Sequence, residues 1–247
     1  WDKCLYMTSN EFLNASSWQG AAVFSFSLDD LYNFNLPTLN WSGALLPSEA
    51  SLVPSNLSGA SYAGLTAGTP NYLVSESLTD YNFNVWKFTP SQNCGSGGLV
   101  TGPFKVTQEI YSWQLPPAQQ MGSSVLLDVI DDRIMQKVQY RKIADKETLW
   151  VTHNVTKSGI KIGQQWAELD VTQGTIAPSP IQQNIYAPDS SRWYWMGSVA
   201  VDGSGNAAIG YSTSSASSYP DIRYVGRLNS DPLNTMPQSE QILVSGG

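Results

Sequence analysis

The chain has 247 residues, of which 41% are hydrophobic, 11% aromatic and only 13% charged, and 13 basic against 20 acidic side chains give a formal net charge of −7. Soluble domains usually carry about 25% charged residues, so charge is sparse, yet 9 Trp, 12 Tyr and 7 Phe provide too much apolar material for a disordered chain. Scattered cations without a basic stripe argue against nucleic-acid binding and against attraction to an anionic membrane. No apolar run approaches the roughly 20 residues of a membrane span, so membrane insertion is not expected either.

Short strands recur along the chain, and helical periodicity is almost absent. The strands are expected in four groups: 5–8 with 21–26; 71–76 with 83–88; 135–140 with 149–155 and 165–169; and 196–201 with 207–212 and 221–227. Polar turns rich in Gly, Pro, Ser and Asn separate them, which is typical of hairpins.

Repetition of such hairpins about every 60 residues favours radial repetition. The prediction is therefore an all-β fold, a β-propeller forming a single domain over residues 1–247. Its blade-like units are expected at roughly 1–35, 40–115, 125–172 and 185–230. A β-sandwich with long loops is the competing architecture.

The clearest local signal is the run Asp-Gly-Ser-Gly-Asn at 202–206, between two strands of alternating small and apolar residues. Gly and Asn supply positive φ, and Asp bonds its own backbone, so the run predicts a tight hairpin turn. Half of a calcium loop is the alternative, but the remaining acidic ligands are missing at the required spacing.

The cysteines and the glycosylation sequons bear on the compartment. Cys4 and Cys94 can form one disulfide or none, and Asn-x-Ser/Thr sequons begin at Asn14, Asn40, Asn56 and Asn154. Together with the low charge and the many Ser, Thr, Asn and Gly residues, these features favour an extracellular protein, in which Cys4 and Cys94 are a disulfide candidate. Two free thiols in a cytosolic protein are the alternative.

Several stretches are similar to a known family. Residues 191–202 and 219–227, together with 132–135 and 70–73, resemble secreted β-propeller proteins of sialidase-like appearance, many of them known only as hypothetical proteins. The resemblance implies the propeller fold and says little about activity, because one fold carries many functions. Four units make a small ring. It is therefore expected to close by pairing of residues 241–244 with the first blade, to belong to a longer polypeptide, or to be completed by neighbouring copies.

Candidate catalytic groups are few. The single histidine, His153, lies in a predicted strand and has no nucleophile elbow beside it, so a structural role is the expectation. A metal site is not expected, because one His and two distant Cys lack ligand spacing. A sialidase-like site would need converging arginines, and Arg133, Arg192 and Arg223 with Asp132 are its candidates. Arg–Asp pairing within the scaffold is the simpler alternative.

Aromatic residues offer a second kind of site. The run Arg192, Trp193, Tyr194 and Trp195 stands just before a strand, and stacked aromatic rings beside polar groups are typical of sugar binding. Alternatively, Trp193 and Trp195 point into the core while Tyr194 faces outward.

The sequence thus predicts a secreted, glycosylated, non-catalytic propeller that acts as a structural, adhesive or carbohydrate-binding module. A propeller glycoside hydrolase, sialidase-like or of another type, is the alternative. No cofactor is expected, and the expected partners are glycans or neighbouring copies of the chain.

Overall fold

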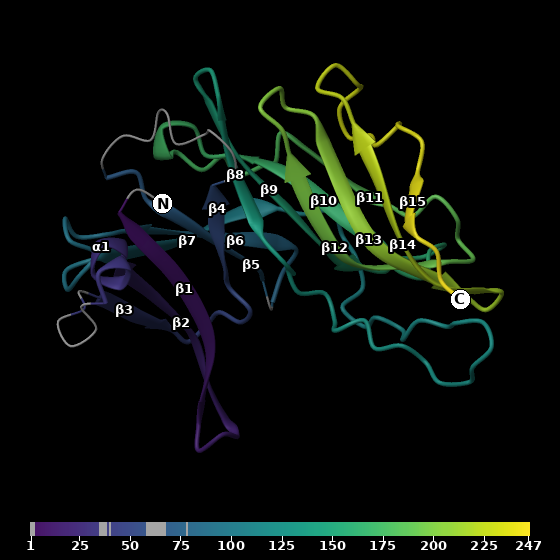
Figure 1. Ribbon diagram of the computed structural model, residues 1–247, viewed down its shortest axis with the longest axis horizontal. Helices are drawn as coiled ribbons and strands as arrows, with labels where there is room; N and C mark the ends of the chain where they lie inside the picture. The colour runs from purple at the N-terminus through teal and green to yellow at the C-terminus, as the bar shows by residue number, and fades with distance from the viewer. Residues whose placement is uncertain (1–2, 35–38, 40, 58–67, 78) are drawn as a thin grey trace.

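The computed structural model describes residues 3–34, 39, 41–57, 68–77 and 79–247. The fold is all-β, and the described residues form three sheets, the short helix α1 (Leu28–Tyr32) and a 3₁₀ turn at Thr172–Gly174. Among these residues no helix is long and apolar enough to span a membrane. The first sheet and the last sheet lie at opposite ends of the molecule (Figure 1).

The first sheet has the order β1–β2–β3, with β1 (Cys4–Leu13), β2 (Ser17–Ser27) and β3 (Trp41–Leu46). One face is buried because alternate residues of β2, such as Ala21 and Val23, pack on Leu73, Trp86 and Phe88 of the next sheet. The β1–β2 hairpin continues past the end of β3 and projects from the body of the molecule (Figure 1).

The second sheet has eight strands in the order β11–β10–β9–β8–β4–β5–β6–β7 and curls into a half-barrel. The strands are β4 (Val53–Leu57), β5 (Asn71–Glu76), β6 (Asn82–Thr89), β7 (Leu99–Thr107), β8 (Val138–Ile143), β9 (Lys146–Val155), β10 (Gly163–Asp170) and β11 (Gln182–Tyr186). Within the described part of this sheet, β4 and β8 pair in parallel and the other neighbouring strands are antiparallel. The two edges approach at one end, where the Thr107 amide donates to Pro178 O at 3.0 Å and the Glu109 amide to Gln183 Oε1 at 3.1 Å.

The core lies mainly inside this half-barrel. Its inner face carries Tyr72, Val85, Tyr140, Val151 and other apolar residues that are almost fully buried. Every residue of β9 after Lys146 is buried, because the other face of β9 packs on the third sheet. Burial on both faces explains why β5 and β9 show no alternation of polar and apolar residues.

The third sheet has the order β12–β13–β14–β15, with β12 (Trp193–Val201), β13 (Ala207–Ser215), β14 (Ser218–Arg227) and β15 (Gln241–Val244). The turn predicted at 202–206 is present: Asp202 Oδ1 accepts from the amides of Ser204 (2.8 Å) and Asn206 (3.0 Å), and Gly205 has φ +82°. Asp202 therefore organises a tight turn.

The blade-like units differ from those expected. Part of the unit 40–115, namely β3, belongs to the first sheet, while the rest of it and the unit 125–172 share the eight-stranded sheet. The described residues form no closed ring. Residues 241–244 pair with β14 instead of with the first blade, so the expected closure through that pairing is wrong.

The disulfide prediction is confirmed. Cys4 and Cys94 are bonded, with Cα atoms 5.7 Å apart, and they join the first residue of β1 to the connection between β6 and β7. Both residues are buried, at 2% and 1% exposure. The bond therefore ties the first sheet to the half-barrel.

Candidate functional site

The segment 128–134, here called the anchored loop, runs outside the named strands, yet buried side chains hold its backbone. Asn154 on β9 makes four hydrogen bonds: Nδ2 donates to Val129 O (2.7 Å) and Asp131 O (3.1 Å), and Oδ1 accepts from Gln164 Nε2 (2.8 Å) and the Met196 amide (2.9 Å). Asn154 is 1% exposed. All the hydrogen-bonding capacity of this amide is used, which positions the loop against β9, β10 and β12.

Two further buried side chains anchor the same loop. His153 Nδ1 donates to Asp132 O at 2.7 Å, and Glu76 Oε2 accepts from the Ile134 amide at 3.0 Å. Glu76 lies on β5 and His153 on β9, so the loop is fixed from two parts of the half-barrel.

The backbone of the loop is strained. Ile130 and Asp131 have φ values of 56° and 65°, a region that β-branched residues such as Ile rarely adopt. Asp128 Oδ1 accepts from the Ile130 amide at 2.8 Å and supports this conformation. Such strain persists only where the surroundings impose it, and it gathers at functional sites.

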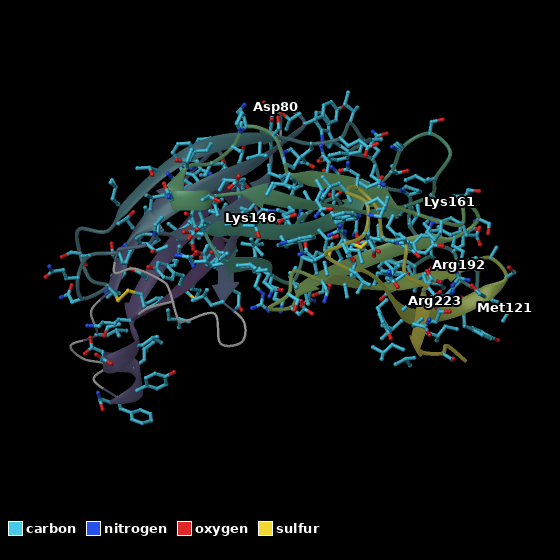
Figure 2. The ribbon with its side chains drawn as sticks, turned by 90° about the horizontal axis from the view of Figure 1, so that it is seen from above. Asp80, Met121, Lys146, Lys161, Arg192 and Arg223 are labelled. Atoms are coloured by element: carbon cyan, nitrogen blue, oxygen red, sulfur yellow. A yellow bond between two sulfur atoms is a disulfide. The ribbon has the colours of Figure 1, made fainter. Side chains whose placement is uncertain are left out.

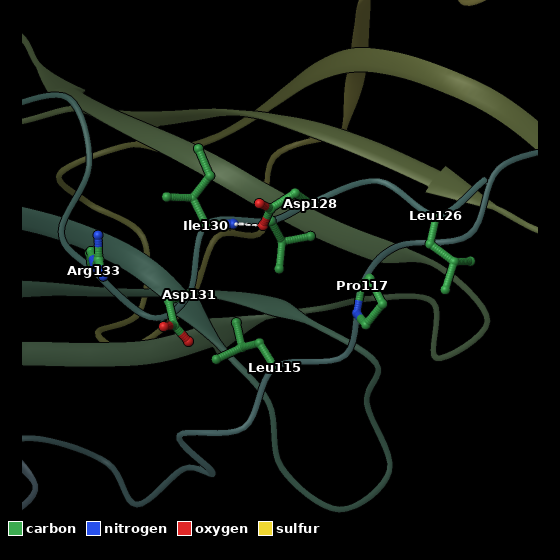
Figure 3. A pocket seen from close by; sticks show the side chains of 8 residues that line it. Leu115, Pro117, Leu126, Asp128, Ile130, Asp131 and Arg133 are labelled. Atoms are coloured by element: carbon green, nitrogen blue, oxygen red, sulfur yellow. Dashed lines mark hydrogen bonds between the residues drawn. The ribbon is translucent and has the colours of Figure 1, made fainter.

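The outer side of the anchored loop lines a cavity of about 540 Å³, here called the loop pocket. Its lining comprises Leu115, Pro117, Leu126, Asp128, Val129, Ile130, Asp131 and Arg133. Figure 3 shows Asp128, Asp131 and Arg133 along one stretch of chain, with Leu115 and Pro117 on the neighbouring segment. Arg133 is exposed and, within the described part of the chain, forms none of the ion pairs within 4.0 Å, while its positive charge acts on the carboxyl groups of Asp132 and Glu76.

Ionisable side chains gather on the inner side of the loop: the half-buried Asp132 of the loop itself and the buried Glu76, Tyr111 and His153. Tyr111 donates its hydroxyl to Asp132 Oδ2 at 3.1 Å, and the Tyr111 and His153 rings meet edge-on at 5.3 Å. Burial raises the pKa of Glu76 to about 8, raises those of Asp132 and Tyr111, and lowers that of His153 to about 4. His153 is therefore neutral at pH 7, and Glu76 is mostly protonated.

An aromatic series connects this buried group with the surface. Tyr81 meets the Tyr111 ring edge-on at 5.7 Å and stacks on Trp113 at 5.3 Å with an interplanar angle of 19°. Trp113 is 42% exposed and stands two residues before Leu115 of the loop pocket. In the sequence, Trp113 stands between Ser112 and the pair Pro116–Pro117, and this loop-like context is the signal that indicated an exposed ring.

The three candidate arginines do not share one site. Arg192 and Arg223 both bind Asp221, at 3.3 Å and 2.8 Å, and Arg223 also binds Glu240 at 2.5 Å. Arg192 and Arg223 lie side by side at the end formed by the third sheet (Figure 2). Arg133 lines the loop pocket, whose lining contains neither of them. Arg192 and Arg223 therefore form ion pairs with Asp221 within the scaffold, as the simpler alternative expected.

The aromatic run on β12 is part of the core. Trp193, Tyr194 and Trp195 are 5%, 1% and 4% exposed. Both tryptophans pack with Ile162, while Tyr194 packs on the other face of the strand with Trp150. Trp193 and Trp195 thus point into the core, as one of the two expectations had it. Tyr194 does not face outward as expected, because β12 is covered on both sides. The run offers no exposed ring to a sugar, and the Arg192 beside it is held by Asp221.

The asparagines of the predicted glycosylation sites differ in their exposure to solvent. Asn14 and Asn56 are exposed, and Asn40 lies outside the described residues. The amide of Asn154 is buried and fully hydrogen-bonded, so a glycan at this position is incompatible with the fold. The expectation at Asn154 is therefore wrong for the folded chain.

Within the described part of the chain, no group of three or more His, Cys, Asp or Glu side chains is placed to hold a metal ion. Comparisons of the chain with protein-family models, with curated proteins and with solved structures find no match.

Proposed function

We propose that this chain is a secreted, non-catalytic carbohydrate-binding module whose binding site is the loop pocket. The observation that carries the proposal is the anchored loop itself. It presents Asp128, Asp131 and the exposed Arg133 to a cavity that is lined by both charged and apolar side chains, while Asn154, His153 and Glu76 hold its strained backbone from below.

The chemistry of the lining suits a sugar. Carboxylates accept hydrogen bonds from hydroxyl groups, and a guanidinium donates to them in a fixed fork geometry. Leu115, Pro117 and Leu126 supply apolar surface for the C–H faces of a pyranose ring. Two carboxylates against one guanidinium leave a formal charge of −1, which favours neutral or amino sugars over acidic ones.

Rigidity supports binding as well. A loop that is already held in its binding conformation loses little conformational entropy when a ligand arrives. Since the anchors are buried, they stay in place whether or not the pocket is filled. Weak hydroxyl contacts, each of which contributes little, then suffice for measurable affinity.

The extracellular location is supported by the Cys4–Cys94 disulfide, the exposed sequons and the low charge. The strand order also supports a propeller-like architecture. Three antiparallel four-stranded units, β4–β7, β8–β11 and β12–β15, follow the three-stranded β1–β3. We also propose that these four groups of strands are blade-like units arranged in a ring that is not closed.

A glycoside hydrolase is the second candidate. The observation in its favour is Asp132, whose pKa is raised by burial and whose carboxylate accepts from Tyr111 beside the loop pocket. A general acid in such an enzyme needs a raised pKa. Turnover of a bound oligosaccharide by the wild type, abolished in Asp132→Asn, would decide for this candidate over simple binding.

The binding proposal is tested with the disulfide-bonded protein on an array of neutral, amino and acidic glycans, followed by calorimetry with the best ligand. Asp131→Asn and Arg133→Gln are expected to weaken binding at least about tenfold, because each removes a charged hydrogen-bonding group. Asp145→Asn changes an exposed carboxylate in the β8–β9 turn and serves as the matched control. Absence of any glycan ligand, or binding unchanged in both pocket variants, contradicts the proposal.

A further inference from the structure

The tip of the β1–β2 hairpin, residues 12–18, combines apolar exposure with a sequon. The tip projects from the body of the molecule (Figure 1), and the apolar side chains on it are therefore exposed. The exposed fractions are 51% for Phe12, 57% for Leu13 and 37% for Trp18. Phe12 and Trp18 are paired across the hairpin, with their rings edge-on at 5.1 Å. Exposed apolar clusters of this kind mark surfaces that something else covers.

The sequon forms the turn of the hairpin. Asn14 and Ala15 have φ values of 52° and 60°, and the Ser16 amide donates to Leu13 O at 3.2 Å. Asn tolerates this left-handed conformation better than most residues, which accounts for its place in the turn. Its side chain is exposed, so the acceptor nitrogen is accessible in the folded chain, in contrast to that of Asn154.

We propose that an N-linked glycan on Asn14 covers the hairpin tip, with its first N-acetylhexosamine stacked on Phe12 and Trp18. Two residues span at most about 7 Å of chain, so Phe12 lies within reach of a sugar attached to Asn14. The C–H groups of a pyranose carry partial positive charge and pack on the negative face of an aromatic ring. The group that covers this apolar surface is then the glycan of the same molecule.

A groove continues from the tip and can receive the outer sugars. A cavity of about 500 Å³ runs along the outer face of the first sheet, with Phe12 in its lining. Trp41 adds a further exposed ring, 55% accessible, while Glu11 and Gln19 supply hydrogen-bonding groups.

The inference rests on the secretion included in the proposed function, but it is independent of the loop pocket. Expression behind a heterologous signal peptide in a eukaryotic secretory host makes the test independent of native localisation as well. Site-resolved glycopeptide mass spectrometry should find Asn14 occupied. The exposed Asn56, which has Pro54 instead of an aromatic residue two positions earlier, is the internal comparison.

Stacking is tested by thermal unfolding of four proteins. Ser16→Ala removes the sequon and leaves Asn14 in place, and Phe12→Ser with Trp18→Ser removes the two rings. The glycan should raise Tm by about 2–4 °C in the wild-type background. It should have no effect in the background without the rings. Trimming the glycan to its first sugar should keep the increase.

An unoccupied Asn14, or an equal Tm increase with and without the rings, overturns the inference. So does self-association of the glycosylated protein that Phe12→Ser abolishes, because a second copy is then the occupant of the tip. Loss of glycan-array binding with these results intact would overturn the loop-pocket proposal alone.

Discussion

Asn154 donates its side-chain amide to the backbone carbonyl of Asp131, at 3.1 Å, across 23 residues of sequence. The same nitrogen also holds Val129 O, at 2.7 Å. A buried β-strand side chain thus determines the conformation of the loop that lines the pocket, and the relationship can be tested directly.

Asn154→Asp replaces this donor with an acceptor of the same shape. The buried carbonyl of Val129 and the partly buried carbonyl of Asp131 lose their partner, and the loss at Val129 alone costs about 1–3 kcal/mol. The free energy of unfolding from urea titration should fall accordingly, and glycan binding at the loop pocket should weaken. Asn229→Asp, at an exposed position in the connection that follows β14, is the control and should change neither quantity. Equal behaviour of the two variants would show that Asn154 does not anchor the loop.

His153 makes stability depend on acid pH. Its pKa is lowered by burial from 6.5 to about 4, so the unfolded chain binds more protons between these values. Stability conferred by the neutral imidazole is complete above pH 6.5 and is lost as pH falls toward 4. A loss of about 3 kcal/mol is expected over this range. His153→Gln removes the titrating group and with it this contribution to stability. The difference in unfolding free energy between wild type and variant should therefore change with pH between 6.5 and about 4.

Glu76 acts with the opposite sign. Burial raises its pKa from 4.5 to about 8, so the folded chain holds a proton that the unfolded chain releases over this range. Its contribution is complete below pH 4.5 and declines as pH rises toward 8, by up to about 5 kcal/mol. Glu76→Gln, which mimics the protonated side chain, should become more stable relative to wild type with rising pH. A difference that does not vary with pH would contradict the assignment.

The Cys4–Cys94 disulfide closes a loop of 90 residues. In the chain-entropy model such a cross-link stabilises the fold by about 4–5 kcal/mol. The variant with Cys4→Ser and Cys94→Ser should unfold at correspondingly lower denaturant concentration, and reducing agent should destabilise only the wild type. Unchanged unfolding midpoints in both experiments would show that the first sheet is held by packing alone.

Sequence patterns predicted those strands whose residues form uninterrupted apolar or alternating runs, such as β5, β9 and β13. Prolines interrupt the pattern in β4, at Pro54, and in β7, at Pro103, and neither strand was predicted. Partners within a hairpin follow from the local pattern, as for β5 with β6, but partners that are far apart in the sequence do not. The parallel contact between β4 and β8 that merges two expected units joins residues about 80 positions apart and depends on the curvature of the whole sheet.

By itself, the sequence determined the all-β class, the turn at Asp202 and, with only two cysteines available, the partner in any intramolecular disulfide. These properties depend on residue type and near neighbours. The tertiary structure alone decided that Trp193, Tyr194, Trp195 and Asn154 are buried, because other sheets cover both faces of their strands. It also decided where a pocket forms. The anchored loop takes its conformation from Glu76 and Asn154, which are far from it in sequence and reach it only once the half-barrel has curled.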